Sequence, residues 1–125
     1  MEEPRRPSVA VLIVEDEPLI RLAAVYQIED AGFEVYEAGS ADAAIALLEV
    51  HKEICLIFTD VDMPGSMDGL KLAHYVRGRW PPVKIIVTSG HVEVSEESLP
   101  SGALFVPKPY DSAVITNKIR EMVAT

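Results

Sequence analysis

A chain of 125 residues, 49% of them hydrophobic, has the size and composition of one globular domain with its own core. The formal net charge of -9 argues against direct nucleic-acid binding, because phosphate contacts need clustered cations. No apolar run approaches the roughly 20 residues that span a bilayer, and the first residues lack the apolar core of a signal peptide, so we expect a cytoplasmic protein that does not enter the membrane.

The first residues predict a leader followed by a buried strand. Residues 1–7 contain two prolines and four charged side chains, so we expect a flexible leader before a folded domain of residues 8–125. A strand is expected over residues 9–14, a continuous and mostly β-branched apolar run that is typical of a strand covered on both faces. Glu15 and Asp16 follow this strand directly.

A helix, a short strand and a second helix come next. The first helix should begin at Pro18, and its apolar residues recur at helical spacing until Gly32 offers a C-terminal stop. Residues 33–38 alternate enough to form a short strand. Ser40 is then expected to cap a helix with one apolar stripe.

The third expected strand covers residues 54–58 and carries an acid at its end. The apolar run stops at Thr59 and Asp60, and Pro64 and Gly65 prevent the strand from continuing. Asp60 is therefore expected at the mouth of a loop. Cys55 lies inside the run, where we expect a small buried hydrophobic side chain.

The remaining elements repeat this alternation. A third helix should begin at Asp68 and end before Pro81. Residues 83–87 are expected to form a fourth strand, and Thr88 follows directly at its end. From residue 91 to 102 the pattern weakens, so any helix there is short.

The last expected strand covers residues 103–106, and Lys108 follows it. Asp111 or Ser112 should cap a final helix with one apolar face.

Strands that alternate with helices at this spacing predict an α/β fold, with a five-stranded parallel sheet and helices on both faces. In such sheets ligands bind beyond the carboxyl ends of the strands. The side chains that end or follow the expected strands are Glu15, Asp16, Asp60, Thr88 and Lys108. We therefore expect three carboxylates, a hydroxyl and an ammonium group at one edge of the sheet.

This set of groups suits phosphoryl transfer. Three carboxylates in one pocket repel each other, and a bound divalent cation relieves the repulsion. Mg²⁺ is the expected ion because it prefers hard oxygen ligands and commonly joins carboxylates to a phosphate, whereas the chain lacks the Cys and His spacing of a zinc site. Each acid alone also has an ordinary explanation, as a helix N-terminus or a turn residue, but their joint placement favours a nucleophilic carboxylate.

The sequence resembles the receiver domain of two-component response regulators from Ser8 to Val123. The resemblance rests on VLIVEDEP, IFTDVDMPGSMDGL, IIVTSG and FVPKPY, in that order. It implies a flavodoxin-like, doubly wound (βα)5 fold with strand order 2-1-3-4-5. The interval from Thr88 to Lys108 is short for this family, so the fourth helix is expected to be short or degenerate, and the loop of residues 64–69 is one residue longer than the commonest form.

The resemblance also implies a phosphorylation-dependent switch in a two-component phosphorelay. Asp60 would accept a phosphoryl group from a sensor histidine kinase or a histidine phosphotransfer protein. Asp16 and Asp60 would bind Mg²⁺ directly, Glu15 mainly through a water molecule, and Asp62 through its backbone carbonyl. The chain would then be no enzyme beyond its own Mg²⁺-dependent phosphorylation and dephosphorylation, either as a stand-alone regulator or as a module of a larger regulator or hybrid kinase.

Further site residues are assigned by the same resemblance. Thr88 matches the switch hydroxyl and Lys108 the phosphate-binding lysine of the family. Phe105 matches the aromatic residue that changes rotamer on activation, although its position in a strand also suits ordinary core packing. Asp62 occupies the position at which such domains tune the lifetime of the phosphoryl group, and the Lys108-Pro109 bond is often cis.

Two other functions stay open from the sequence. Asp60-Val61-Asp62 resembles the nucleophile motif of haloacid-dehalogenase-type phosphatases, but there the motif follows the first strand and the acidic pair comes last, whereas Glu15 and Asp16 precede it here. The chain is also short for that core with a cap. A receiver-like interaction module that is never phosphorylated is the other alternative, and the complete set of site residues argues against it.

Overall fold

The computed structural model describes residues 9–65, 67–91 and 93–124. The expected leader of residues 1–7 lies outside these ranges. None of the helices within them combines the length and the apolar composition that a membrane span requires.

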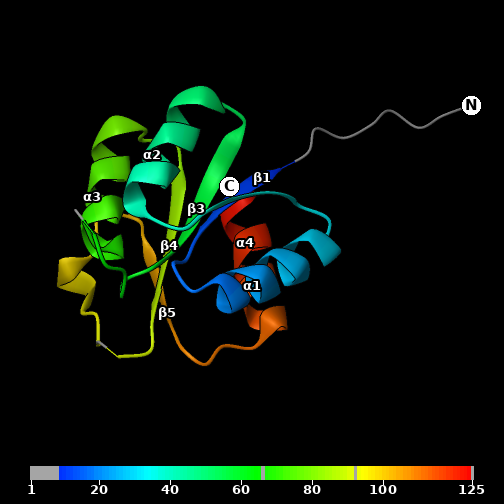
Figure 1. Ribbon diagram of the computed structural model, residues 1–125. Helices are drawn as coiled ribbons and strands as arrows, with labels where there is room; N and C mark the ends of the chain where they lie inside the picture. Colours follow the sequence, from blue (N-terminus) through cyan, green and yellow to red (C-terminus); the bar gives the residue numbers. More distant parts are fainter. Residues whose placement is uncertain (1–8, 66, 92, 125) are drawn as a thin grey trace, which may run out of the picture.

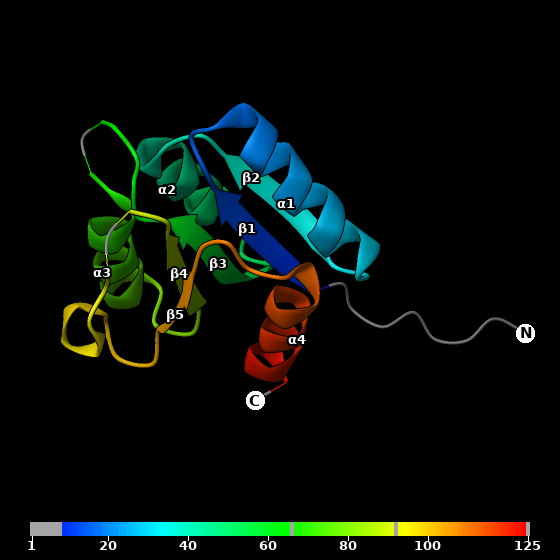
Figure 2. The same cartoon turned by 90° about the horizontal axis from the view of Figure 1, so that it is seen from below.

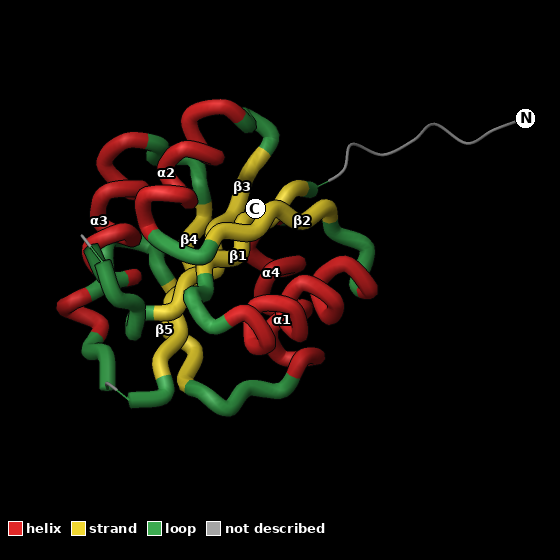
Figure 3. Tube along the Cα trace, in the orientation of Figure 1, coloured by secondary structure: helices red, strands yellow, loops and turns green. Residues whose placement is uncertain are grey.

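Five parallel strands form a single sheet in the order β2-β1-β3-β4-β5, which confirms the expected order. The strands are β1 (Ala10–Val14), β2 (Glu34–Ala38), β3 (Ile54–Asp60), β4 (Lys84–Ser89) and β5 (Leu104–Pro107). The helices are α1 (Pro18–Asp30), α2 (Ala41–Val50), α3 (Gly69–Arg79) and α4 (Ser112–Val123), with the short 3₁₀ helix η1 (Glu96–Ser98) between β4 and β5. Strands and helices alternate along the chain, so every parallel pair is joined by a crossover (Figures 1 and 3).

Helices cover both faces of the sheet, with α2 and α3 on one side and α1 and α4 on the other (Figures 1 and 2). Leu12, Ile57 and Leu72 belong to the buried cluster under α2 and α3. Val11 and Ile119 belong to the cluster under α1 and α4. Because successive side chains of a strand point to opposite faces, Val11 and Leu12 belong to different clusters, which explains why β1 is apolar without a break.

Side-chain caps fix the starts of three helices. Ser40, Asp68 and Asp111 each accept a hydrogen bond from a backbone N–H two or three residues further along the chain, at 3.1, 2.9 and 2.8 Å. The expected starts are therefore confirmed, and Asp111 rather than Ser112 caps α4. Gly32, with a φ of 101°, follows the end of α1 in the left-handed conformation that glycine favours.

We expect Ser40→Ala to lower the free energy of unfolding by about 1 kcal/mol, the usual cost of losing an N-cap hydroxyl. The substitution leaves the N–H of Ala43 without the acceptor that Ser40 Oγ provides. Urea unfolding followed by circular dichroism measures the change. Ser101→Ala, at an exposed serine in the turn before β5, is the control, and an equal loss in both variants would contradict the capping role.

The structure extends two strands beyond their apolar runs. The third and fourth strands were expected over residues 54–58 and 83–87, but β3 continues to Asp60 and β4 to Ser89. The reason is backbone pairing, which does not need apolar side chains: Asp60 lies opposite Thr88 in the register of β3 and β4. Cys55, expected to be buried, is only half-buried because it lines an open pocket between the ends of α2 and α3.

The segment between β4 and β5 contains η1 as its only helix among the described residues, which confirms the expected loss of a full fourth helix. Val94 and Leu99 from this segment pack against the core cluster under α2 and α3. His74 of α3 contacts it through its ring, whose Nε2 lies 2.7 Å from the carbonyl oxygen of Ser98. The segment therefore covers this part of the sheet without a full helix.

Candidate functional site

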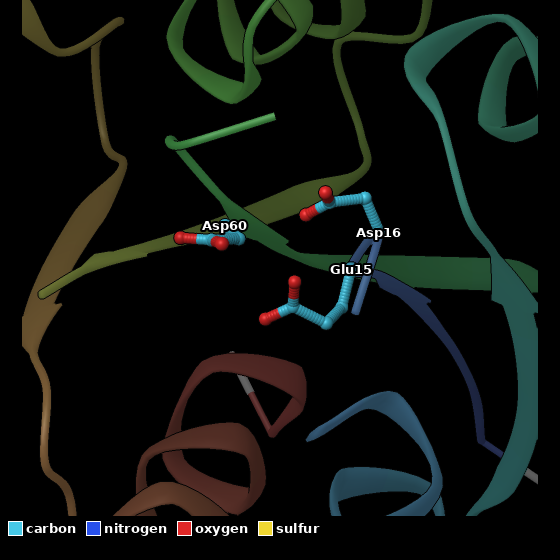
Figure 4. Close-up of side chains that lie close together, drawn as sticks. All are labelled: Glu15, Asp16 and Asp60. Atoms are coloured by element: carbon cyan, nitrogen blue, oxygen red, sulfur yellow. The ribbon is translucent and has the colours of Figure 1, made fainter. Parts of the chain in front are cut away.

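Three carboxylates meet beyond the ends of β1 and β3 (Figure 4). Glu15 and Asp16 lie in the turn between β1 and α1, and Asp60 is the last residue of β3. One oxygen from each carboxylate lies within 4.8 Å of the other two. Glu15 and Asp60 are buried and Asp16 is partly exposed. The acidic cluster expected from the strand ends is therefore present.

Lys108 is placed against two of these carboxylates by the loop that follows β5. Its Nζ lies 3.1 Å from Glu15 Oε1 and 3.3 Å from Asp60 Oδ2. Burial works to lower the pKa of Lys108, but its hydrogen bond to Glu15 and the charge of Asp60 outweigh burial and raise the pKa. The lysine is therefore held as a cation inside the acidic cluster.

The pKa of Glu15 is raised, mainly because the carboxyl group is buried, and the charge of Asp60 adds to the effect. Hydrogen bonds from the backbone N–H of Glu17 and from Lys108 oppose it. Lys108 thus compensates only part of the negative charge, which leaves the cluster suited to a further cation.

Thr88 lies beside Asp60 with its hydroxyl group unused. Its Cα is the register partner of Asp60, and the residue is 3% exposed. Within the described residues, Oγ1 of Thr88 is buried and has no hydrogen-bond partner. A buried hydroxyl without a partner costs free energy, so its presence beside a carboxylate indicates a ligand that would accept its hydrogen bond.

A cavity of about 190 Å³ gives access to the cluster. Its lining includes all three carboxylates together with Asp62 and Lys108. Carboxylate oxygens that converge from two neighbouring turns are the donor set that Mg²⁺ prefers, so the residues present fit this ion. The cavity also has room for a phosphoryl group next to Lys108, which is a suitable cationic partner for one.

The other expected site residues lie around this centre. The backbone N–H of Asp62 points to Asp60 Oδ1 at 3.4 Å, while its role as a carbonyl ligand of the metal stays a prediction. Phe105 is partly buried and packs against the core cluster under α2 and α3, and its role as a switch aromatic also stays a prediction. The Lys108-Pro109 peptide bond is cis.

Two residues that contribute to the site were not singled out from the sequence. Ser89 donates a hydrogen bond through Oγ to Asp62 Oδ2 at 2.8 Å. Ser89 could have been placed from the sequence, because side chains alternate along β4 and Ser89 must therefore point to the face opposite Thr88. Gly69 is the first residue of α3 and lies against the backbone of Asp60. From the sequence, Asp68 and Gly69 predicted only the start of a helix.

Comparison with known proteins identifies the family. The response regulator receiver domain model matches residues 11–120. The sensor kinase CckA of Brucella abortus (strain 2308) is 34% identical over 120 residues, which cover 93% of this chain and 13% of that protein. The chain spans only 13% and 26% of the first two curated relatives it matches.

Solved structures agree with this match. A response regulator receiver protein from Sinorhizobium medicae WSM419 has a TM-score of 0.87 at 26% identity, covering 94% of this chain and 96% of that one. The receiver domain of the hybrid histidine kinase CckA has a TM-score of 0.77 at 30% identity, covering 91% and 98%. With its acidic cluster at the expected strand ends, the chain belongs to the receiver domain family of response regulators, which work in phosphorylation-based two-component signalling.

Proposed function

We propose that Asp60 is the phosphoryl acceptor of a two-component signalling switch. The observation that carries the proposal is the environment of its carboxylate, which contacts Lys108 and lies beside the hydroxyl of Thr88, a group without a hydrogen-bond partner in the described part of the chain. A cation and a free hydrogen-bond donor next to one carboxylate are what a transferred phosphoryl group requires.

Three side chains of the site have a role in the transfer. One Asp60 oxygen attacks phosphorus, the bond from phosphorus to the donor nitrogen breaks with its electron pair left on the imidazole, and Asp60 becomes an acyl phosphate. Lys108 then compensates the charge of the phosphoryl oxygens, and Thr88 donates a hydrogen bond to one of them.

The proposal includes Mg²⁺ at the acidic cluster. Asp16 and Asp60 would hold it directly, Glu15 through a water molecule and Asp62 through its backbone carbonyl. When bound, the ion supplies the positive charge that offsets the phosphoryl group and the carboxylates. This assignment is supported by the convergence of the three carboxylates and by the raised pKa of Glu15.

A sensor histidine kinase or a histidine phosphotransfer protein is the proposed phosphodonor, in the cytoplasm. A groove of about 600 Å³ lies between α1 and the loop after β5, and Lys108 forms part of its lining. Leu19 and Tyr110 line it, and Leu19 is 77% exposed. An apolar surface beside the acceptor suits a donor protein that presents a phosphohistidine on a helix with apolar neighbours. The downstream target is either another protein or a second copy of the chain.

The test is to incubate the protein with acetyl phosphate, with Mg²⁺ or with EDTA, and to record intact masses and released phosphate over time. We expect one phosphoryl group per chain with Mg²⁺ and none with EDTA, because the cluster lacks enough positive charge without the metal. Neither adduct nor phosphate release in Mg²⁺ would overturn the proposal and favour the interaction module. Steady turnover of p-nitrophenyl phosphate would favour the phosphatase.

A further inference from the structure

Arg21, near the start of α1, bridges the turn after β1 and the strand β2. Its Nη1 donates a hydrogen bond to the backbone carbonyl of Glu15 at 2.8 Å, and its Nε donates to Glu37 Oε1 at 3.0 Å. The side chain is only 22% exposed and passes close to Gly39, where a Cβ would lie 3.2 Å from Nη1. Because the donors of a guanidinium are fixed in one plane, Arg21 holds both acceptors in a defined relative position.

The backbone of Glu15 is thereby held on both sides. Its N–H donates to the carbonyl oxygen of Ala38 at 3.0 Å, and its carbonyl accepts from Arg21. The carbonyl of Glu15 and the N–H of Asp16 belong to one planar peptide unit, which turns as a whole. An arginine that fixes this carbonyl therefore also fixes the direction in which the Asp16 side chain leaves the turn.

Asp16 depends on this backbone more than Glu15 does. The Glu15 carboxylate is buried and is bound directly by Lys108 and by the N–H of Glu17. Asp16 is only partly buried and borders the cavity of about 190 Å³. One of its oxygens nevertheless lies within 4.8 Å of oxygens of Glu15 and Asp60. The conformation of the turn is therefore what keeps the third carboxylate in the cluster.

We infer that Arg21 is a positioning residue for the divalent cation: through the carbonyl of Glu15 it holds Asp16 in the direction in which Asp16 binds the metal. This role rests on the proposed function, in particular on Mg²⁺ at the acidic cluster. Contacts that orient a metal ligand without touching the ion typically change metal affinity by roughly 10–100-fold when they are lost.

The charge of Arg21 acts in the opposite direction to its hydrogen bond. A guanidinium repels a nearby cation, so removal of its charge alone would strengthen cation binding. The ion pair with Glu37 reduces this repulsion. Loss of positioning weakens cation binding instead. A neutral residue in place of Arg21 therefore separates the two effects by the sign of the change in affinity.

The experiment titrates the unphosphorylated chain with Mn²⁺, measures the free ion by electron paramagnetic resonance, and then displaces it with Mg²⁺. Mn²⁺ suits the same carboxylate, carbonyl and water ligands as Mg²⁺. We expect Arg21→Gln to raise the dissociation constants of both ions by about tenfold. Arg21→Lys should lie between this variant and the wild type, because an ammonium group lacks the fixed fork that spans both acceptors.

Arg120→Gln is the matched control. Arg120 also donates to a backbone carbonyl, that of Ala31 at 3.2 Å, but Ala31 lies at the opposite end of α1 from the acidic cluster. The same chemical change is therefore expected to leave the affinity for Mn²⁺ and Mg²⁺ unchanged. An equal loss of affinity in both variants would overturn the role of Arg21.

The Mg²⁺ dependence of phosphorylation by acetyl phosphate provides a second readout. Arg21→Gln is expected to need about tenfold more Mg²⁺ for its half-maximal rate, while its rate at saturating Mg²⁺ stays near that of the wild type. General damage to the fold would lower the rate at saturation and leave the half-maximal concentration unchanged. That pattern would contradict a positioning role.

Unchanged or tighter binding of Mn²⁺ by Arg21→Gln would overturn the inference. If this variant does not fold, Arg21→Lys carries the test, and an affinity equal to that of the wild type would overturn the inference. A wild-type chain that binds Mn²⁺ but is not phosphorylated would overturn the proposed acceptor and leave the role of Arg21 standing. A wild-type chain that binds neither ion would overturn the metal site and the role of Arg21 together, so the failures are distinguishable.

Discussion

Asp60→Asn is expected to abolish phosphorylation by acetyl phosphate, with no adduct in intact mass spectra under conditions that label the wild-type chain. The amide of asparagine lacks the anionic oxygen that attacks phosphorus, so the whole reaction is lost rather than slowed. The fold should persist, since the amide keeps the shape of the carboxylate that it replaces and Lys108 would still contact Glu15 at 3.1 Å.

The matched control is Asp30→Asn, the same chemical change at the exposed last residue of α1. It is expected to be phosphorylated like the wild type. A wild-type adduct on Asp60→Asn would show that another residue is the acceptor.

The centre of the site could be predicted because it depends on strand ends. Asp60 follows an apolar run that is typical of a buried strand. Glu15 and Asp16 likewise follow the apolar run that forms β1. In a parallel sheet these ends must lie at one edge, so the pattern that predicts the strands also predicts the cluster. The short helix between β4 and β5 could also be predicted, because residues 91–102 contain few large apolar side chains.

The contacts around that centre could not be predicted because they depend on register and side-chain direction. The path of the loop after β5 determines that Lys108 contacts both Glu15 and Asp60 rather than solvent. The bond from Ser89 to Asp62 depends on how far β4 continues, and the apolar run ended before Thr88. The boundaries of the domain at residues 8 and 125 stay a prediction, since the family match covers residues 11–120.

Gly69→Ala is expected to destabilise the protein by about 2–3 kcal/mol, toward the upper end of the usual cost of overpacking. A Cβ atom at Gly69 would lie 1.8 Å from the carbonyl oxygen of Asp60 and 2.9 Å from the Cα of Val61. Both neighbours are backbone atoms that a side-chain rotation cannot move away. The start of α3 would therefore have to shift from the end of β3, which also displaces Asp60 and is expected to slow phosphoryl uptake.

Gly78→Ala provides a control in the same helix. Among the described residues, a Cβ at Gly78 meets no heavy atom within 4 Å apart from its chain neighbours and the backbone of its own helix, so this substitution should raise stability by about 0.5–1 kcal/mol through the better helix propensity of alanine. Urea unfolding of both variants measures the change in the free energy of unfolding relative to the wild type, and we expect the two changes to have opposite signs. Equal effects would mean that α3 does not need the close approach of Gly69 to Asp60. A loss of stability at Gly69 alone, together with slower phosphorylation, would mean that this approach fixes the position of the acceptor.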